Sequence, residues 1–191
     1  MICFYDPKDP YGFFSNFSRH NVFVYGVTWR TSEHPFQAMK FHPHRPDLIK
    51  LVYAATSPGA AARLGRDRSF PLHSGWDAAP VEINIEGDLS KFQFSDGLSR
   101  PGVQPEPIFA RWKDVVMYTV VYAKFTQHRD LREVLLGTGD ETIVEDAVHD
   151  PYWGRGSSHV GENKLGRILM AVRYAIAHNT GKPGNVVVQA R

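Results

Sequence analysis

Two long segments in the second half of the chain have helical periodicity, and they constrain the fold more than any other feature. One of them, "NKLGRILMAVRYAIAHN", repeats apolar residues at spacings of three and four, as a helix with one buried face does. The other, "WKDVVMYTVVYAKFTQH", begins at Trp112 and shows the same repeat. The expected buried positions are Leu165, Ile168, Leu169, Val172 and Ile176 in the first and Val115, Val116, Thr119, Val120 and Ala123 in the second. These helices favour a mainly α protein.

Shorter helices are expected before and between the two long ones. The segment 31–41 starts with capping residues and a proline that fits the first turn, and 46–55 again has one apolar face. Ser57 followed by Pro58 is a typical start of a third helix. The segment "DLREVLLGTG" at 130–139 ends with glycine, which is common after short helices.

The N-terminal residues 2–29 have the pattern of short strands and turns. "ICFY" is followed by the turn-rich "DPKDPYG", and "NVFVYGVTW" has a Tyr25-Gly26 turn between residues that favour β structure. We therefore expect a small β portion near the N-terminus of an otherwise helical fold.

The length of 191 residues is enough for one well-formed core and short for two. A single domain over 1–180 and a flexible tail over 181–191 are expected. Residues 69–110 contain five prolines and predict a long irregular excursion within this domain.

Composition excludes several classes of protein. The net charge of +2 is too small to establish nucleic-acid binding, although a local basic groove remains compatible with it. Cys3 is the only cysteine, so neither an intrachain disulfide nor a cysteine metal cluster can form. The N-terminus does not have the pattern of a secretory signal, and no segment is apolar over the length of a membrane span. A soluble intracellular protein of the cytoplasm or nucleus, without membrane partners, is expected.

Three stretches combine polar side chains with aromatic residues and glycine: "YGFFSNF" at 11–17, "TSEHPFQAMKF" at 31–41 and "DPYWGRG" at 150–156. This combination suits a pocket that stacks on a flat ring and hydrogen-bonds its edge. Each stretch alone also fits a packed turn. Glu33 likewise has a simple structural interpretation, because the helix macrodipole favours an acidic residue in the first turn.

Charged and histidine residues elsewhere are less specific. Arg66 and Arg68 in "GRDRS" suit phosphate or diphosphate oxygens, and a solvated charged turn explains them equally well. His42 and His44 flank a proline and have no acidic or cysteine partner at a recognisable spacing. No metal site is predicted.

Eight sequence blocks, taken together and in order, resemble the NADAR superfamily, which is linked to NAD and ADP-ribose chemistry and includes YbiA-like N-glycosidases. The resemblance covers nearly the whole chain. The blocks are "FYDPKDPYGFFSNF", "GVTWRTSEHPFQAMKF", "AARLGRDRS", "RWKDVVMYTVVYAKFTQH", "LREVLLGTG", "IVED", "DPYWGRG" and "GENKLGRILMAVR".

The resemblance implies a mainly α, single-domain YbiA-like fold and hydrolysis of an N-glycosidic bond at ribose C1, without a cofactor. The favoured substrate is ADP-ribose attached to guanine in nucleic acid, because paired arginines and several aromatic residues suit a diphosphate and two ring systems. A small ribosylamino-pyrimidine phosphate of riboflavin synthesis is the alternative substrate. The alternative from another class is a module that binds ADP-ribose without cleaving it.

The resemblance also implies roles for individual residues. Glu33 corresponds to the catalytic carboxylate, Trp112 to a tryptophan that precedes a long helix, and Asp150 to an acid before the "YWG" element. Trp76 is the alternative tryptophan, and if Trp112 is correct then 77–110 is an insertion. The expected substrate-binding residues are Asn16, Phe17, Ser32, His34, Gln37, Lys40, Arg66, Arg68, Tyr152, Trp153, Gly154 and Asn163. His34 or Asp150 is expected to give the departing base a proton or a hydrogen bond at a ring nitrogen.

Overall fold

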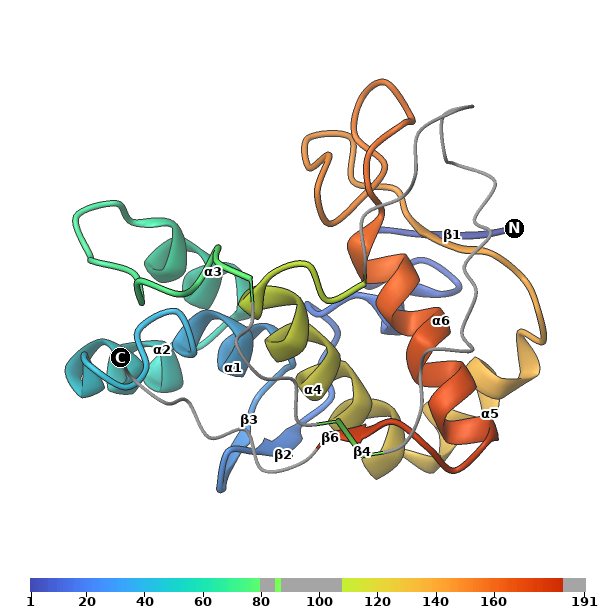
Figure 1. Cartoon of the computed structure of the whole chain (residues 1–191), viewed down its shortest axis with the longest axis horizontal. Coiled ribbons are helices and arrows are strands. Elements are labelled where there is room, and N and C mark those ends of the chain that lie inside the picture. Colours follow the sequence, from blue (N-terminus) through green and yellow to red (C-terminus); the bar gives the residue numbers. More distant parts are fainter. Residues whose placement is uncertain (80–84, 87–107, 184–191) are drawn as a thin grey trace.

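A computed structural model describes residues 1–79, 85–86 and 108–183 of the chain (Figure 1). The described part is mainly α, as the periodicity predicts. Its helices are α1 (Glu33–Ala38), α2 (Pro46–Ala54), α3 (Pro58–Arg66), α4 (Trp112–Gln127), α5 (Arg129–Gly137) and α6 (Lys164–Ala177), with a short 3₁₀ helix η1 (Gly12–Phe14).

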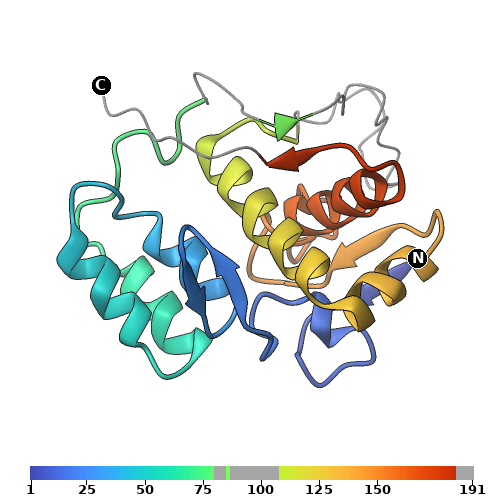
Figure 2. The same ribbon diagram turned by 90° about the horizontal axis from the view of Figure 1, so that it is seen from below.

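The central element is α4, which packs against α6 and also contacts α1 and the N-terminal hairpin. Val116 and Val120 of α4 are fully buried, as are Ile168 and Val172 of α6. The sequence predicts one buried face for α4, whereas buried residues surround most of this helix. The reason is its position between two groups of elements: α1 to α3 lie on one side and α5 and α6 on the other (Figure 2).

The first group of helices brings α1 against both α2 and α3. The predicted start of α3 is confirmed, because the Ser57 hydroxyl accepts a hydrogen bond from the Ala60 N–H. Helix α1 is shorter than the expected 31–41. Its last turn tightens, since the Lys40 and Phe41 N–H groups donate to carbonyls three residues back, at Gln37 and Ala38.

Strands occur in both halves of the chain. The predicted hairpin consists of β2 (Val22–Val24) and β3 (Val27–Trp29), joined by Tyr25 and Gly26 at φ values of 55° and 78°. Two positive φ values are the geometry of a two-residue hairpin turn. The β portion is, however, not confined to the N-terminus.

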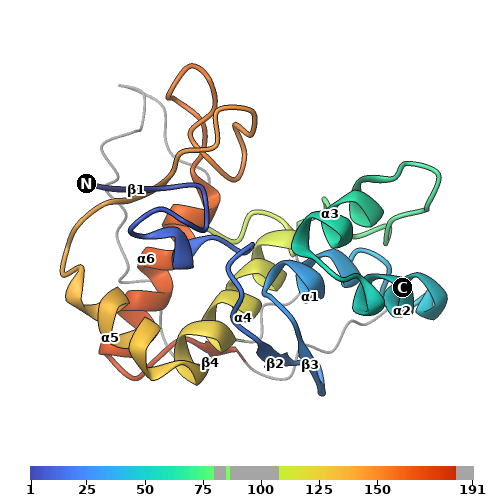
Figure 3. The same cartoon turned by 180° about the vertical axis from the view of Figure 1, so that it is seen from behind.

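Strand β1 (Ile2–Phe4) pairs in parallel with β5 (Ile143–Glu145), and this pairing places Phe4 opposite Glu145. The segment between β5 and α6 forms loops at the end of the molecule where α6 begins, beside β1 (Figure 3). These loops carry the "DPYWGRG" stretch. The parallel pair therefore positions both the end of β5 and the loops that follow it.

The fold continues beyond the predicted domain end at 180. The Tyr118 hydroxyl donates to the Gly181 carbonyl at 2.6 Å, and β6 (Lys182–Pro183) pairs with β4 (Ile85–Glu86). Residues 80–84 and 87–107 of the expected insertion, and 184–191 of the expected tail, lie outside the described residues. No helix in the described part of the chain has the length and apolar character needed to cross a bilayer.

Candidate active site

A cavity of about 240 Å³ lies where α1, the end of α3, the start of α4 and the end of β5 meet. Segments far apart in the sequence supply its walls. The lining residues are Ser15, Asn16, Phe17, Glu33, Phe36, Gln37, Lys40, Arg66, Arg68, Leu72, Trp76, Asp77, Lys113, Met117, Glu145, Asp150, Trp153 and Leu165. The three stretches that the sequence singles out therefore meet at one cavity.

Glu33 is the first residue of α1, and it is 5% exposed. Gln37, one turn further along, donates a hydrogen bond from Nε2 to Glu33 Oε1 at 2.7 Å. Burial raises the pKa of Glu33, while the Gln37 hydrogen bond and the charges of Lys40 and Arg66 act in the opposite direction. Glu33 is thus a buried carboxyl group whose neighbours favour its ionised form.

The loop that contains Asn16 is tied to both α1 and α4. The Ser32 hydroxyl donates to Asn16 Oδ1 at 2.9 Å, and the Glu33 N–H donates to the Asn16 carbonyl at 3.2 Å. From α4, the buried Lys124 ammonium donates to Ser18 Oγ at 2.6 Å and to the Ser15 carbonyl at 3.0 Å. Ser32 accordingly orients Asn16 and does not itself line the cavity.

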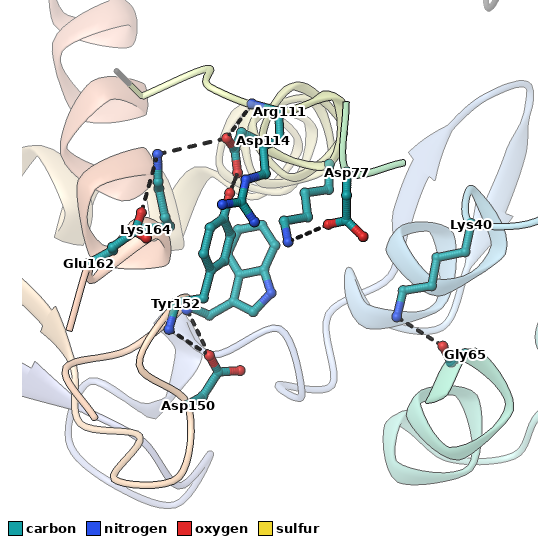
Figure 4. Close-up of polar contacts among 11 residues, drawn as sticks. Lys40, Gly65, Asp77, Arg111, Asp114, Asp150, Tyr152, Glu162 and Lys164 are labelled. Carbon is teal, nitrogen blue, oxygen red and sulfur yellow. Dashed lines mark hydrogen bonds and ion pairs between the residues drawn. The ribbon is translucent and has the colours of Figure 1, made fainter. Parts of the chain in front are cut away.

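Aromatic rings form one wall of the cavity. Phe36 of α1 lies between two indoles, with ring centroids 5.3 Å from Trp76 and 5.3 Å from Trp153. The Trp153 ring is nearly perpendicular to Phe36, at 88°. Asp150 fixes the adjoining turn, because its Oδ1 accepts hydrogen bonds from the N–H groups of Tyr152 and Trp153 at 3.0 and 2.9 Å (Figure 4).

A third carboxyl group, Glu145, joins Glu33 and Asp150 in the lining. It ends β5, where its N–H donates to Asn163 Oδ1 at 2.9 Å. Burial, together with the charges of Asp150 and Glu33, raises the pKa of Glu145 to about 8. Three acids of one cavity thus have different surroundings.

Cationic side chains line the same cavity as these acids. Lys40 Nζ donates to the Gly65 carbonyl at 3.0 Å, and burial lowers the pKa of Lys40 to about 8 although Glu33 opposes this shift (Figure 4). Lys113 forms an ion pair with Asp77 at 2.7 Å. Arg66 and Arg68 are exposed, and neither has a hydrogen-bond or ion-pair partner among the described residues. These two guanidinium groups remain available to an anion.

Tyr152 is outside the cavity lining, contrary to its expected role in binding. Its hydroxyl donates to Asp114 Oδ1 at 2.6 Å, and Asp114 Oδ2 accepts from the Arg111 N–H at 2.9 Å (Figure 4). The ammonium of Lys164 lies 3.8 Å from the same carboxylate. This buried network holds the 150–153 turn against α4 and α6, so Tyr152 supports the wall that Trp153 contributes.

Four further expected site residues also lie outside the lining. His34 is fully buried, with Nδ1 2.9 Å from Thr31 Oγ1 and Nε2 3.1 Å from the Ala55 carbonyl. Both nitrogens are therefore engaged, so His34 is not placed to protonate a ligand in the cavity. Asn163 bridges β5 to α6, and Gly154 packs closely under the Glu145 carbonyl. Trp112 is the fourth.

The structure distinguishes the two candidate tryptophans. Trp76 is 4% exposed and lines the cavity, whereas Trp112 packs against the core at the start of α4 and is absent from the lining. The backbone of Trp76 is joined to the first turn of α4, because the N–H of Lys113, the residue after Trp112, donates to the Trp76 carbonyl. The position of Trp112 at the start of α4 therefore does not bring its indole ring to the cavity.

Sequence reasoning assigned no role to Glu145, Lys113 or Met117 of the lining. The sequence signal for Glu145 is its place in the "IVED" block, which belongs to the family pattern but assigns no role to this acid. Within the described ranges, no group of three His, Cys, Asp or Glu side chains is placed to hold a metal ion.

The chain is similar to several known proteins. The family model for the NADAR domain matches residues 3–101 and 95–177. N-glycosidase Npun_R5314 of Nostoc punctiforme is 36% identical over 176 residues, which are 92% of each chain. The NMR structure of E. coli YbiA superposes with a TM-score of 0.69 at 36% identity, covering 93% of this chain and 85% of that one. The maize chloroplastic riboflavin biosynthesis protein PYRR is 31% identical over 92% of this chain and 25% of its own length.

Proposed function

This chain belongs to the NADAR domain family and is a hydrolase of N-glycosyl bonds, and we propose that it removes ADP-ribose from guanine bases in DNA. One observation carries the proposal. A buried carboxylate, an aromatic wall and guanidinium groups that have no partner among the described residues line the same cavity. These are the groups that a ribose C1, a base and a diphosphate require.

Hydrolysis at ribose C1 passes through a transition state with oxocarbenium character, so positive charge develops on the sugar. A carboxylate beside C1 stabilises that charge or activates the attacking water. Glu33 has this role in the proposal. The Gln37 hydrogen bond and the nearby cations support it, because they favour the ionised form of Glu33 despite its burial. Asp150, the second expected acid, helps to hold the ribose.

The remaining lining residues match the other parts of the substrate. Phe17, Trp76 and Trp153 offer aromatic surface to a base or adenine ring, and Trp76, the alternative tryptophan, has the role first expected of Trp112. Arg66 and Arg68, with Lys40, are the proposed contacts of the diphosphate. Asn16 is held by Ser32 and presents an amide to a hydroxyl or base edge.

A ribosylamino-pyrimidine phosphate is the second candidate substrate. The specific observation in its favour is that the maize relative is named a riboflavin biosynthesis protein. Both candidates have a ribose C1–N bond, and they differ in the number of phosphates and rings. The ADP-ribosyl substrate is preferred because several cations and four aromatic residues, Phe36 among them, line the cavity. These groups suit a diphosphate and two ring systems.

The test is a direct comparison of the two substrates. The protein is incubated with a DNA oligonucleotide carrying ADP-ribosylated guanine and, separately, with the ribosylamino-pyrimidine phosphate, and kcat/KM is measured for release of the base or amine. A higher value for the oligonucleotide supports the proposal. A higher value for the pyrimidine phosphate replaces it by the second candidate, and tight binding of ADP-ribose with no release from either favours a binding module.

A further inference from the structure

Breaking a ribose C1–N bond needs a proton donor as well as a carboxylate, because the departing nitrogen accepts the electron pair of the bond. His34, an expected donor, has both ring nitrogens engaged outside the cavity. Asp150 Oδ1 accepts two backbone N–H groups, so this oxygen is engaged in holding the turn. The donor must therefore be sought among the other groups of the lining.

Two further acids line the cavity: Asp77 is paired with Lys113, and Glu145 lies beside the other two acids. Its backbone is fixed at both polar groups, since its N–H donates to Asn163 Oδ1 at 2.9 Å and its carbonyl accepts from the Arg155 N–H at 3.0 Å. The carboxyl oxygen Oε2 is buried and has no hydrogen-bond partner among the described residues. A buried, unpartnered carboxyl oxygen is costly when ionised and is available to donate when protonated.

We propose that Glu145 is the general acid of the hydrolysis, giving the proton of its carboxyl group to the nitrogen that leaves ribose C1. This assignment rests on the proposed N-glycosidase function. In the step, the C1–N bond breaks, its electron pair goes to the nitrogen, and that nitrogen takes the proton from Glu145. Water adds its oxygen to C1 and loses one proton to the Glu33 carboxylate. Transfer of a proton from Glu33 back to Glu145 through solvent restores the starting state.

The surroundings of the two glutamates support opposite roles. Gln37 donates to Glu33, and the charges of Lys40 and Arg66 act on it, so these neighbours oppose the rise in its pKa that burial causes. Glu145 instead faces the charges of Asp150 and Glu33, and the pKa of Glu145 is raised to about 8 by burial and by these two acids. Environments that separate two carboxyl groups in this way distinguish an acid from a base. The charged groups around the cavity are Glu33, Lys40, Arg66, Arg68, Asp77, Lys113 and Asp150.

The first test compares turnover of the wild type and Glu145→Gln on both candidate substrates. Loss of a general acid lowers kcat by a factor of about 100 to 10,000, with KM little changed. Glu133→Gln is the matched control, because Glu133 is an exposed residue of α5 that pairs with Arg129. Thermal unfolding of each variant reports on its fold. A Glu145→Gln enzyme with wild-type kcat overturns the assignment.

The second test needs no variant of Glu145 to fold. Carbon-13 NMR of protein labelled at glutamate carboxyl carbons follows each titration in the wild type. One glutamate is expected to titrate near pH 8, as the pKa of Glu145 indicates, and Asp150→Asn should move that titration to lower pH by removing a charge. Titration of every glutamate near its ordinary value overturns the assignment.

These outcomes separate the two levels of inference. A wild type that cleaves a substrate while Glu145→Gln cleaves it equally well removes the acid role and leaves the proposed function standing. A wild type that cleaves neither substrate removes the proposed function, and the acid role falls with it.

Discussion

Gln37 donates a 2.7 Å hydrogen bond to Glu33 within α1, and Gly65 of α3 leaves the space that the Gln37 amide occupies. A Cβ atom at Gly65 would lie 1.8 Å from Gln37 Oε1. Two helices therefore cooperate in this contact: α1 carries the carboxylate and its donor, and α3 supplies a residue small enough to admit them.

Gly65→Ala is expected to lower kcat/KM by about 10-fold or more, because a hydrogen bond to a charged group contributes roughly 1.5–3 kcal/mol. The added methyl displaces the flexible end of Gln37, so the midpoint of thermal unfolding should change little. Gly59→Ala in the same helix is the control, since its Cβ would meet only Arg63 at 3.8 Å. Equal activity of the two variants would contradict this account of Gln37.

Trp76 and Trp112 provide a second prediction. Trp76→Leu should raise KM about 5-fold or more, because stacking of a base on an aromatic side chain contributes roughly 1–3 kcal/mol. Trp112→Leu should leave KM close to the wild-type value, since Trp112 does not line the cavity. Steady-state kinetics on the cleaved substrate measure both. A larger KM effect at Trp112 would show that it, as the sequence predicts, belongs to the site.

Lys124 provides a prediction about stability. Its buried ammonium donates to the Phe13 and Ser15 carbonyls and to Ser18 Oγ, and Lys124→Met leaves all three acceptors without this donor. A hydrogen bond that involves a charged group contributes about 1.5–3 kcal/mol, so urea unfolding should show a loss of at least that size. KM should also rise, because the loop holding Asn16 loses its anchor. Lys50→Met, at an exposed position of α2, should show neither change.

Much of the fold was predictable because its signals are local. The long helices, the Ser57 cap and the Tyr25-Gly26 hairpin each follow from neighbouring residues. The parallel pairing of β1 with β5 was missed, since its partners are separated by most of the chain and three-residue strands have little periodicity. The burial of α4 on most sides also depends on distant elements.

The candidate site was predictable where a motif delivers several residues to one place, as with Glu33, Gln37 and Lys40. It was not predictable where a side chain next to a site residue can point either into the cavity or into the core. His34 follows Glu33 directly but turns into the core, and Tyr152 precedes Trp153 but bonds to Asp114. Glu145 was missed because an acid at a strand end shows its significance only once Glu33 and Asp150 are near it.

The raised pKa of Glu145 has a consequence for stability. The folded protein keeps the Glu145 proton up to a pKa of about 8, whereas the unfolded chain releases it near the ordinary value of 4.5. Between these values the folded state binds more protons, so the free energy of unfolding falls as pH rises, by at most about 1.4 kcal/mol per pH unit. Glu145→Gln lacks this titration and should gain stability relative to the wild type across the same window. Urea unfolding at a series of pH values measures the difference, and parallel curves would contradict the shift.

The most direct measurement for the central claim is release of ADP-ribose from DNA that carries ADP-ribosylated guanine, by the wild type and by Glu33→Gln. The amide keeps the shape of the side chain and removes the charge that stabilises the sugar cation, so ADP-ribose binding should persist while turnover falls by a factor of about 100 or more. Release by the wild type together with this loss in Glu33→Gln is the predicted result. A fully active Glu33→Gln enzyme would contradict the role of Glu33 as the carboxylate of the site.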